Sequence, residues 1–434
     1  FLQRARHCFT ICGGEVMATP KLRFKEFDGD WTSKQLGKII GISSASRVFK
    51  EQWQDSGVPF FRTSDVVSIF KNKENEKAYI SLELFEELAK KSGKIKQGDL
   101  LVTGGGSIGI PYLVPNDQPL YFKDADLLWM KSSGIVEGSF LYNFFISPKF
   151  REYLKSISHT GTISHFTIEQ AKATPFGFPS KEEQTKIASF LSNVDEKISQ
   201  LTQKHELLSQ YKQGMMQKLF SQQIRFKADD GSEFGEWENK TLSNFIIKHI
   251  GGASLKPSDF VEQSEYEVIP KKAIVPNGYL NLDKDNPTYC SEDFFKANLK
   301  NTVDNTYLVT VLRDLVPSGP SIGYIVKYME NTQYILAQGV YGFKLKEELN
   351  KDFLIHFSNT KAYRLVMQSI MVGSTQVHIR NQDFFGIEIP VPCLEEQTKI
   401  ANFLSAIDQK IEVVAQQIEQ AKTWKKGLLQ QMFV

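Results

Sequence analysis

Two long segments of the chain carry apolar residues at alternating steps of four and three positions. This spacing is typical of a coiled-coil seam, because residues three and four apart share one face of a helix. The first segment has Ile187, Leu191, Val194, Ile198 and Leu201, and the second has Ile400, Leu404, Ile407, Ile411 and Val414. The same steps continue towards the end of each segment, with polar interruptions at His205, Lys212 and Lys425.

Each segment predicts a helix of about 39 residues, roughly 58 Å long at 1.5 Å per residue. A helix this long cannot cover its own apolar stripe, so the simplest partner for one stripe is the other; a dimerisation helix is the alternative. Ser180 can cap the first helix, and Glu183 stands where a capping box needs an acid. Cys393 replaces Ser180 at the second start, so that cap is predicted to be weaker.

The two segments are copies of one another. Residues 182–191 read EEQTKIASFL, and residues 395–404, which lie 213 positions later, read EEQTKIANFL. The register holds without a gap to Phe220 and Phe433. Solenoid repeats have periods of roughly 20–50 residues, so this duplication indicates two whole domains, each followed by one long helix.

Short anchors extend the duplication into the domains. Residues 23–25 recur at 225–227, the segment from Phe27 to Trp31 recurs at 234–237 with one deletion, and the turn at 105–109 has a partner at 319–323. Residues 161–165 align with 374–378, again 213 positions apart. Between these anchors the halves share almost nothing. Two related modules that bind different ligands would show this pattern, in which the anchors are retained and the residues between them differ.

The pattern inside each domain is mixed. Residues 99–103 and 307–312 are apolar and β-branched and predict strands, whereas residues 83–90 and 351–368 have helical spacing. Residues 140–156 also predict a helix, which Pro148 should break or kink. The predicted fold class is therefore α/β, of the α+β kind, with strand-rich domains.

Composition excludes several classes of protein. A length of 434 residues suggests two to three domains. The formal net charge of +2 excludes a polybasic, non-specific nucleic-acid binder, so any nucleic-acid surface must come from local clustering. No apolar run reaches the roughly 20 residues that span a bilayer. The four cysteines, none at a metal-ligand spacing, predict a reduced, cytoplasmic protein.

The first sixteen residues are unlike the start of a folded domain. Met17 follows Gly-Gly-Glu-Val, and codons for Gly-Gly-Glu are purine-rich, as a bacterial ribosome-binding site is. We expect Met17 to be the natural start and residues 1–16 to be a translated leader. A cleaved targeting peptide is the alternative, although the apolar core of such a peptide is missing.

Motifs for catalysis are weak. The glycine run at 104–106 lacks the Gly-Lys-Ser/Thr of a P-loop, so a tight turn between strands is favoured, although a DNA-facing loop stays open because glycine lets a backbone approach a phosphate. Residues 286–289 resemble the Asn-Pro-Pro-Tyr signature of adenine methyltransferases, but the third residue differs and no glycine-rich cofactor strand precedes them. His165 and His378 have no matched nucleophile and acid. We predict no catalytic and no metal site.

The chain resembles the specificity subunits of type I restriction-modification systems over about residues 20–434. The resemblance rests on Pro-x-x-Glu-Glu-Gln-x-Lys-Ile-Ala-x-Phe-Leu at 179–191 and 392–404, on the Phe-x-Gly-x-Trp opening, and on paired Gly-Thr-x-x-His turns, in which Ser374 replaces the second glycine. It implies target recognition domains at residues 17–180 and 223–392, related by pseudo-twofold symmetry. It also implies spacer helices at residues 181–222 and 393–434 that pack antiparallel as a coiled coil between them.

The function implied by this resemblance is sequence-specific binding of double-stranded DNA without catalysis. Each domain would read one half of a bipartite, asymmetric target. The partners would be two copies of a methyltransferase subunit, which uses S-adenosylmethionine, and restriction subunits, which use ATP and Mg²⁺; this chain would hold no cofactor. A stand-alone adenine methyltransferase and a coiled-coil scaffold without a DNA role remain as alternatives.

Polar and basic residues on predicted loops are the candidates for DNA contacts, because such groups read base edges and fix the register on phosphates. In the first domain they are Arg62, Thr63, Ser64, Thr103, Ser107, Thr160, Thr162 and His165. In the second domain they are Lys271, Lys272, Arg313, Ser318, Ser321, Gln376, His378 and Arg380.

Overall fold

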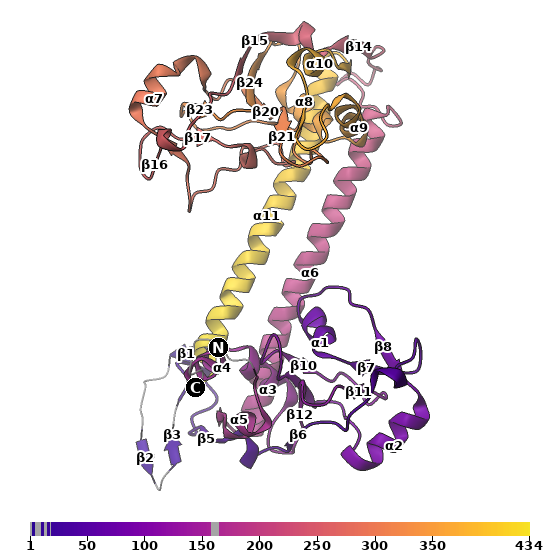
Figure 1. Cartoon of the computed structure of the whole chain (residues 1–434), viewed down its shortest axis with the longest axis vertical. Coiled ribbons are helices and arrows are strands. Elements are labelled where there is room, and N and C mark those ends of the chain that lie inside the picture. The colour runs from indigo at the N-terminus through magenta and orange to yellow at the C-terminus, as the bar shows by residue number, and fades with distance from the viewer. Residues whose placement is uncertain (1, 5–9, 13–14, 18, 158–164) are drawn as a thin grey trace. The chain divides into compact units, whose positions relative to one another are not determined.

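The computed structural model describes residues 2–4, 10–12, 15–17, 19–157 and 165–434 (Figure 1). The chain divides into two compact units. Unit 1 comprises Phe1–Thr202 and Gln416–Val434, and unit 2 comprises Gln203–Ala415. Each unit therefore contains one mixed domain together with part of each long helix.

The domain of unit 1 is built on a four-stranded antiparallel sheet in the order β10-β9-β12-β6, beside a three-stranded sheet in the order β11-β7-β8. A strand pair, β5 with β13, closes the domain next to the long helix. Its helices are α1 (Thr63–Phe70), α2 (Leu82–Ser92), α3 (Gly138–Ile146), α4 (Pro148–Ser156) and α5 (Ile168–Ala173), with short 3₁₀ turns η1 (Leu36–Lys38) and η2 (Lys50–Gln52). Its strands are β1 (Leu2–Arg4), β2 (Thr10–Cys12), β3 (Glu15–Met17), β4 (Leu22–Phe24), β5 (Thr32–Gln35), β6 (Ile42–Ser43), β7 (Val58–Phe61), β8 (Ala78–Ile80), β9 (Leu100–Thr103), β10 (Pro111–Leu113), β11 (Tyr121–Phe122), β12 (Leu127–Met130) and β13 (Pro175–Phe178).

The domain of unit 2 repeats this plan. Its four-stranded sheet has the order β22-β20-β24-β15, and β14 pairs with β26 as β5 pairs with β13. Its helices are α7 (Glu292–Ala297), α8 (Lys351–Ser358), α9 (Lys361–Ile370) and α10 (Asn381–Phe385), with η3 (Leu242–Phe245), η4 (Pro257–Asp259), η5 (Lys271–Ala273) and η6 (Leu299–Asn301). Its strands are β14 (Glu238–Thr241), β15 (Ile246–Gly251), β16 (Phe260–Val261), β17 (Val268–Ile269), β18 (Tyr289–Cys290), β19 (Thr302–Val303), β20 (Leu308–Val311), β21 (Arg313–Asp314), β22 (Ile325–Val326), β23 (Tyr334–Leu336), β24 (Val340–Leu345), β25 (Val377–His378) and β26 (Glu388–Val391).

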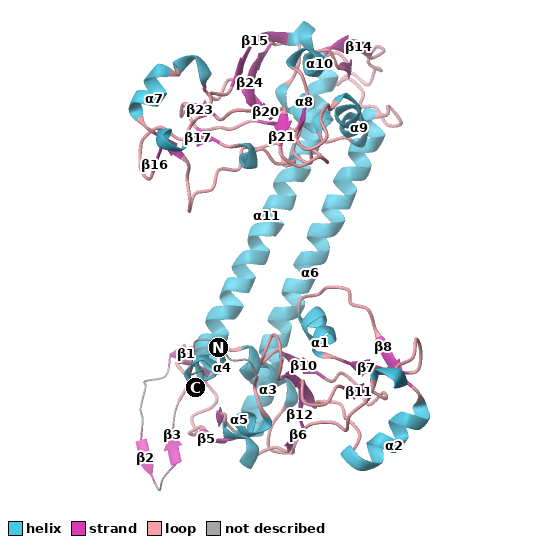
Figure 2. Cartoon of the chain, in the orientation of Figure 1, coloured by secondary structure: helices cyan, strands magenta, loops and turns pink. Residues whose placement is uncertain are grey.

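The smaller sheets show where the two copies differ. In both units a parallel pair, β7 with β11 or β17 with β23, extends the domain. The third strand then joins on opposite sides: β8 pairs with β7, whereas β19 pairs with β23. The mixed helix and strand content of both domains confirms the predicted fold class (Figure 2).

The helical segments predicted within the domains are interrupted. The break predicted at Pro148 within residues 140–156 is confirmed, because the Ser147 hydroxyl accepts the N–H of Phe150 and Pro148 begins α4. The single helix predicted at 351–368 is wrong for the same reason: the Thr360 hydroxyl accepts the N–H of Tyr363, so α8 ends and α9 begins there. These hydroxyls occupy equivalent positions, 213 residues apart.

The long helices are α6 (Lys181–Phe220) and α11 (Leu394–Met432). In unit 1 the Lys425 ammonium lies 2.6 Å from a carboxylate oxygen of Asp195, and in unit 2 the Lys212 ammonium lies 2.6 Å from one of Asp408. In each unit an early residue of one helix meets a late residue of the other, so the helices are antiparallel there. Two of the polar interruptions in the seam are therefore cross-helix ion pairs.

The apolar stripe does more than join two helices. Ile187, Leu191 and Val194 are buried in one cluster with Phe140 of the first domain, and Leu428, Leu429, Met432 and Phe433 belong to the same cluster. In unit 2, Ile400, Leu404 and Ile407 lie in the corresponding cluster with Phe353. Leu201 and Val414 are buried, whereas Ile198 and Ile411 are only partly buried. The start of each helix is thus part of a domain core.

An ion pair with a buried glutamate fixes each long helix to its domain. Glu183 accepts from Arg23 at 2.7 and 2.6 Å and from the Trp31 indole at 3.4 Å. Glu396 accepts from Arg225 at 3.1 and 2.8 Å and from Trp237 at 3.1 Å. The capping box predicted for Glu183 is therefore wrong: the Ser180 hydroxyl does accept the N–H of Glu183, but the carboxylate is bound by the domain.

The neighbouring glutamines repeat the same connection. The Gln184 amide donates to the carbonyls of Ile135 and Pro179 and accepts the N–H of Glu137. Gln397 makes the equivalent bonds to Glu348, Pro392 and Asn350. The duplicated Glu-Glu-Gln sequence is thus the joint between domain and helix.

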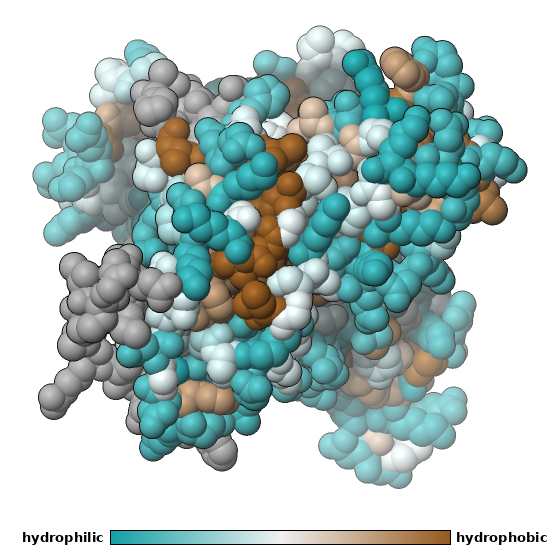
Figure 3. Space-filling model, turned by 90° about the horizontal axis from the view of Figure 1, so that it is seen from below, coloured by the Kyte–Doolittle hydropathy of each residue, from teal (hydrophilic) through white to brown (hydrophobic). Residues whose placement is uncertain are grey.

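The face turned to the viewer in Figure 3 is mainly hydrophilic around one central apolar area.

In the segment predicted to be a leader, residues 1–16, the structure describes residues 2–4, 10–12 and 15–16. Only short strands are described in it, of which β1 pairs with β4. The leader and the predicted domain boundaries stay predictions.

Candidate nucleic-acid interface

In the second domain an exposed turn rises from the end of β20. The backbone N–H of Leu312 donates to Gly339, and the N–H of Ile379 donates to the carbonyl of Leu312. Directly beyond Leu312, β21 pairs with β25, so that Arg313 faces His378. Facing residues of an antiparallel pair point to the same side, with Cβ atoms about 4.5–5.5 Å apart. Arg313 and His378 therefore present their side chains together.

The first domain contains the same backbone frame with other side chains. The N–H of Gly104 donates to Asp126, and the N–H of Phe166 donates to Gly104. Gly105 then forms a bridge with His165. By these bonds Gly105 is equivalent to Arg313, Asp126 to Gly339, and His165 to His378.

A fourth pair of equivalent positions comes from the parallel strands. The backbone N–H of Lys123 donates to the carbonyl of Phe61, and the N–H of Ala337 donates in the same way to the carbonyl of Ile269. Phe61 and Ile269 are therefore equivalent positions. Thr63 and Lys271 each follow two residues later. The Thr63 hydroxyl lies 3.4 Å from the Asp126 carbonyl, and the Lys271 side chain passes Gly339. The frame thus presents Thr63, Gly105, Asp126 and His165 in one domain and Lys271, Arg313, Gly339 and His378 in the other.

An arginine from the helix behind holds each turn in place. Arg151 of α4 donates to the carbonyls of Ile108 and Gly109, at 3.1 and 3.3 Å. Arg364 of α9, which lies 213 positions later, donates to the carbonyls of Ile322 and Pro320. Gly109 and Gly323 close the turns at positive φ, 71° and 79°. The glycine turns singled out in the sequence are therefore rigid supports for the exposed positions.

Three candidates of the first domain, Thr63, Ser107 and His165, lie at this turn, whereas the Ser64 hydroxyl accepts from the Asn75 amide. Thr63 is partly buried beside it, while Ser64, Ser107 and His165 are exposed. Thr160 and Thr162 lie outside the described residues. The prediction for Thr103 is wrong, because its side chain is fully buried and its hydroxyl bonds the backbone of Ser107 and Ile110. The predicted position of Thr103 in a strand did not reveal whether its side chain points into the domain or towards solvent.

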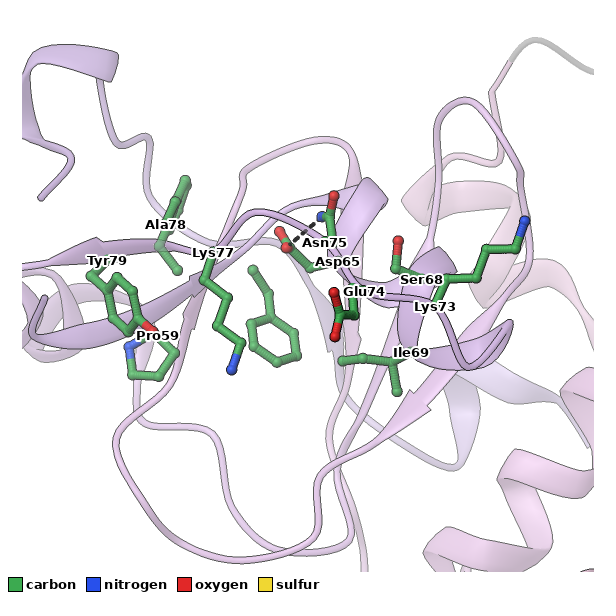
Figure 4. A pocket seen from close by; sticks show the side chains of 12 residues that line it. Pro59, Asp65, Ser68, Ile69, Lys73, Glu74, Asn75, Lys77, Ala78 and Tyr79 are labelled. Atoms are coloured by element: carbon green, nitrogen blue, oxygen red, sulfur yellow. Dashed lines mark hydrogen bonds between the residues drawn. The ribbon is translucent and has the colours of Figure 1, made fainter. Parts of the chain in front are cut away.

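The prediction for Arg62 is also corrected. Its guanidinium binds Asp65 at 2.9 Å, the carbonyl of Glu76, and the face of Trp53. The hydrogen bond with Asp65 raises the pKa of Arg62. Asn75 donates to the same carboxylate at 2.8 Å, beside a pocket of about 590 Å³ (Figure 4). Arg62 therefore anchors the start of α1 instead of projecting towards a ligand.

The candidates of the second domain fall into two groups. Lys271, Arg313 and His378 share the frame, and the exposed Ser318 and Gln376 lie on the loops beside it. Ser321 donates to Asp314 at 2.9 Å and shapes the turn, and the exposed Arg380 precedes α10. Lys272 lies apart, 3.6 Å from Asp283.

The two frames differ in charge. In the second domain no ion pair joins Lys271 or Arg313 to a carboxylate of the described chain, and burial together with the nearby Arg313 charge lowers the pKa of Lys271. In the first domain Asp126 supplies a carboxylate, one oxygen of which lies 2.6 Å from Lys123. The sequence analysis missed Asp126. Its distance of 213 positions from Gly339, the offset of the duplication, could have marked the two residues as equivalent. Only the structure shows that this position faces the turn.

Metal ligands, membrane-spanning helices and the methyltransferase-like motif bear on other kinds of function. Within the described ranges no group of three or more His, Cys, Asp or Glu side chains could hold a metal ion, and no helix is long and apolar enough to cross a membrane. Residues 286–289, which resembled a methyltransferase signature, end at the first residue of β18, and the carbonyl of Thr288 just before this strand accepts the N–H of Val268.

The architecture defines a tandem protein in which one supporting frame carries two different surface sites. The model of the type I restriction modification DNA specificity domain matches residues 28–210 and, a second time, residues 235–423. The chain belongs to this family, as its sequence predicted.

Relatives agree with this assignment. The chain is 28% identical, over 296 residues, to the type I restriction enzyme MjaVIII specificity subunit of Methanocaldococcus jannaschii, covering 67% of this chain and 68% of that protein. It is similar in fold to the S subunit of a type I restriction-modification system from M. genitalium, with a TM-score of 0.55 and 17% identity over 96% of this chain and 99% of that one. A chain from a structure of type I R-M complex assembly gives a TM-score of 0.56 at 15% identity, over 93% of this chain and 97% of that one.

Proposed function

We propose that this chain is the DNA-reading subunit of a type I restriction-modification complex and that its two domains read two different half-sites. The observation that carries the proposal is the duplicated frame. Equivalent backbone bonds hold four equivalent positions around the turn in both units, yet three of the four positions differ in side chain. Two readers with different side chains would give a bipartite, asymmetric target.

The long helices supply a means of setting the distance between the half-sites. Both run from one unit into the other, and the Glu183 and Glu396 joints fix each helix to a domain. A helix held by a buried ion pair cannot swivel freely at its base. We therefore assign to α6 and α11 the role of a spacer, which matches the role that the family resemblance implies.

The chemistry of methylation and cleavage belongs to the partners in this proposal. The specificity subunit is non-catalytic, and it works with other subunits of the restriction-modification complex on DNA. Two methyltransferase copies using S-adenosylmethionine, and restriction subunits using ATP and Mg²⁺, complete the proposed assembly in the cytoplasm. The alternatives, a stand-alone adenine methyltransferase and a scaffold without a DNA role, gain no support from the family or the relatives.

Methylome sequencing of a host that co-expresses this chain with its methyltransferase subunit tests the proposal. The expected result is adenine methylation at a split, non-palindromic motif with a fixed gap, which disappears when this chain is omitted. A palindromic or ungapped motif would contradict two different readers. Methylation by the purified chain alone would support the methyltransferase alternative, and lack of any DNA binding in the complex would support the scaffold.

A further inference from the structure

Two positively charged side chains lie next to each other in the second domain, and neither forms an ion pair with a carboxylate of the described residues. A Cβ atom built on Gly339 would lie 2.8 Å from Cε of Lys271 and 3.0 Å from Cβ of Arg313. Gly339 has a φ of 88°, a conformation that favours glycine. The backbone at Gly339 therefore leaves the space through which the two side chains approach each other.

Keeping two like charges together costs free energy, and the cost rises as water is removed. The carboxylate of Asp314, which follows Arg313, is held by the Ser321 hydroxyl and the backbone N–H of Val316 and forms no ion pair with either cation. Its attraction to Lys271 is smaller than the repulsion from Arg313. The arrangement becomes favourable once a group rich in hydrogen-bond acceptors lies between or above the two cations.

The position of the pair decides what such a group can be. Arg313 is exposed, faces His378 across β21 and β25, and follows a strand whose four residues are all buried. Its backbone is held by strand pairing, and the turn beyond it is fixed by Arg364. A side chain on such a rigid base suits readout of a base edge, whereas a flexible tail would be sufficient for attraction to phosphates.

The first domain has the opposite character at the same positions. Thr63 stands in place of Lys271, Gly105 in place of Arg313, and Asp126 in place of Gly339. Oδ1 of Asp126 would lie 3.1 Å from a Cβ built on Gly105, so this carboxylate oxygen occupies the space over the glycine. The first domain thus offers an acceptor where the second offers two donors.

We propose, on the basis of the DNA-reading function above, that these equivalent positions determine the bases: Lys271 and Arg313 select a guanine in the second half-site, and Asp126 selects a base with an exocyclic amino group in the first. In the major groove guanine presents two acceptors, O6 and N7, which suit Arg and Lys. Cytosine N4 and adenine N6 are donors, which suit a carboxylate.

The test compares Arg313→Gln and Lys271→Met with Lys296→Met in the complete complex. Lys296→Met is the matched control, because it removes the same charge from an exposed lysine of the second domain that pairs with Glu292 and is not a candidate for DNA contact. Methylome sequencing reads the motif, and binding of the native duplex and a duplex with the guanine replaced is measured at several salt concentrations. Thermal unfolding confirms that each variant is folded.

The expected result is that Arg313→Gln and Lys271→Met relax one guanine position of the second half-site. Discrimination against the replaced base should fall by about 5- to 150-fold, the usual value of a good bidentate contact. Lys296→Met should leave the motif intact, and Asp126→Asn should relax one position of the first half-site only.

Two results would overturn the inference. If the two variants weaken binding to every duplex equally and lower the salt dependence by about one ion each while the motif stays intact, the cations contact phosphates. If neither motif nor affinity changes, they do not contact DNA. In both cases a split motif from the unaltered chain would leave the proposed function standing, whereas absence of any motif would remove the function itself.

Discussion

At the scale of single residues, the joint between domain and helix depends on buried charges. Glu183 and Arg23 are only 1% and 5% exposed, and Glu396 is fully buried. Removing one partner of a buried ion pair leaves an uncompensated charge and typically costs about 3–5 kcal/mol. We expect Glu183→Ala to lower the stability of unit 1 by about this amount.

Urea unfolding monitored in unit 1 measures the effect. Glu182→Ala is the matched control, because the adjacent carboxylate is exposed, and it should leave the unfolding midpoint almost unchanged. Equal midpoints for the two variants would mean that the ion pair does not fix the helix. The sequence could not reveal this joint, since Arg23 and Glu183 are 160 positions apart and the local pattern suggested a capping box.

A buried histidine makes the stability of unit 2 depend on pH. His356 bonds the Ser405 hydroxyl at 3.1 Å, and burial, aided by the charge of Lys212, lowers the pKa of His356 to about 3. Asp408 lies 3.9 Å away but pairs with Lys212 at 2.6 Å. The neutral ring is therefore the form that the folded domain holds.

The folded-state pKa is below the unfolded value of about 6.5, so the unfolded chain binds the extra proton. The stabilising contribution is fully present above about pH 6.5 and is lost as the pH falls towards 3. Between pH 7 and pH 5 the loss should be about 2 kcal/mol. His356→Asn, which copies the buried Asn143 of the first domain, should unfold with a smaller pH dependence over this range. An equal pH dependence in urea titrations would refute this account.

At the scale of elements, sequence periodicity located the long helices because their apolar stripe is continuous. It also found β9 and β20, whose residues are all buried. It could not show that the starts of α6 and α11 belong to the domain cores. The sequence of an apolar stripe has the same pattern whether the stripe packs against another helix or against a domain. It missed the pairing of β21 with β25, because two-residue strands have no period to detect.

The spacer role of α6 and α11 can be tested by lengthening both. Four residues inserted after Leu201 and four after Val414, which are equivalent positions, add about one turn, or roughly 6 Å, to each helix. With a rise of about 3.4 Å per base pair, the gap of the methylated motif should grow by one or two base pairs. Both half-sites should stay as they are.

Methylome sequencing of the lengthened complex provides the measurement, and insertion of four residues into one helix alone serves as the control. That variant loses the register of the ion pairs of Lys212 and Lys425 and should lose activity. A gap that stays constant with full activity in the doubly lengthened complex would show that the helices do not measure distance.

At the scale of the whole molecule, duplication explains why one fold carries two sites. The bonds that set the frame repeat: the Glu-Glu-Gln joint, the arginine behind each turn, and the backbone bonds around Leu312 and Gly104. The positions that differ are those held around the turn. Sequence comparison within the chain revealed the repeated parts, whereas the equivalence of these positions required the structure, because they share no residue except a histidine.

The most direct test of the central claim is the exchange of one domain. Residues 17–180 are replaced by the first domain of another family member that carries an equivalent arginine and tryptophan, so that the joint with Glu183 forms again. The methylome of the complex is then sequenced. Independent readers on a common frame predict that the first half of the motif changes to that of the donor, while the second half and the gap stay the same. A change in both halves, or in neither, would contradict the account.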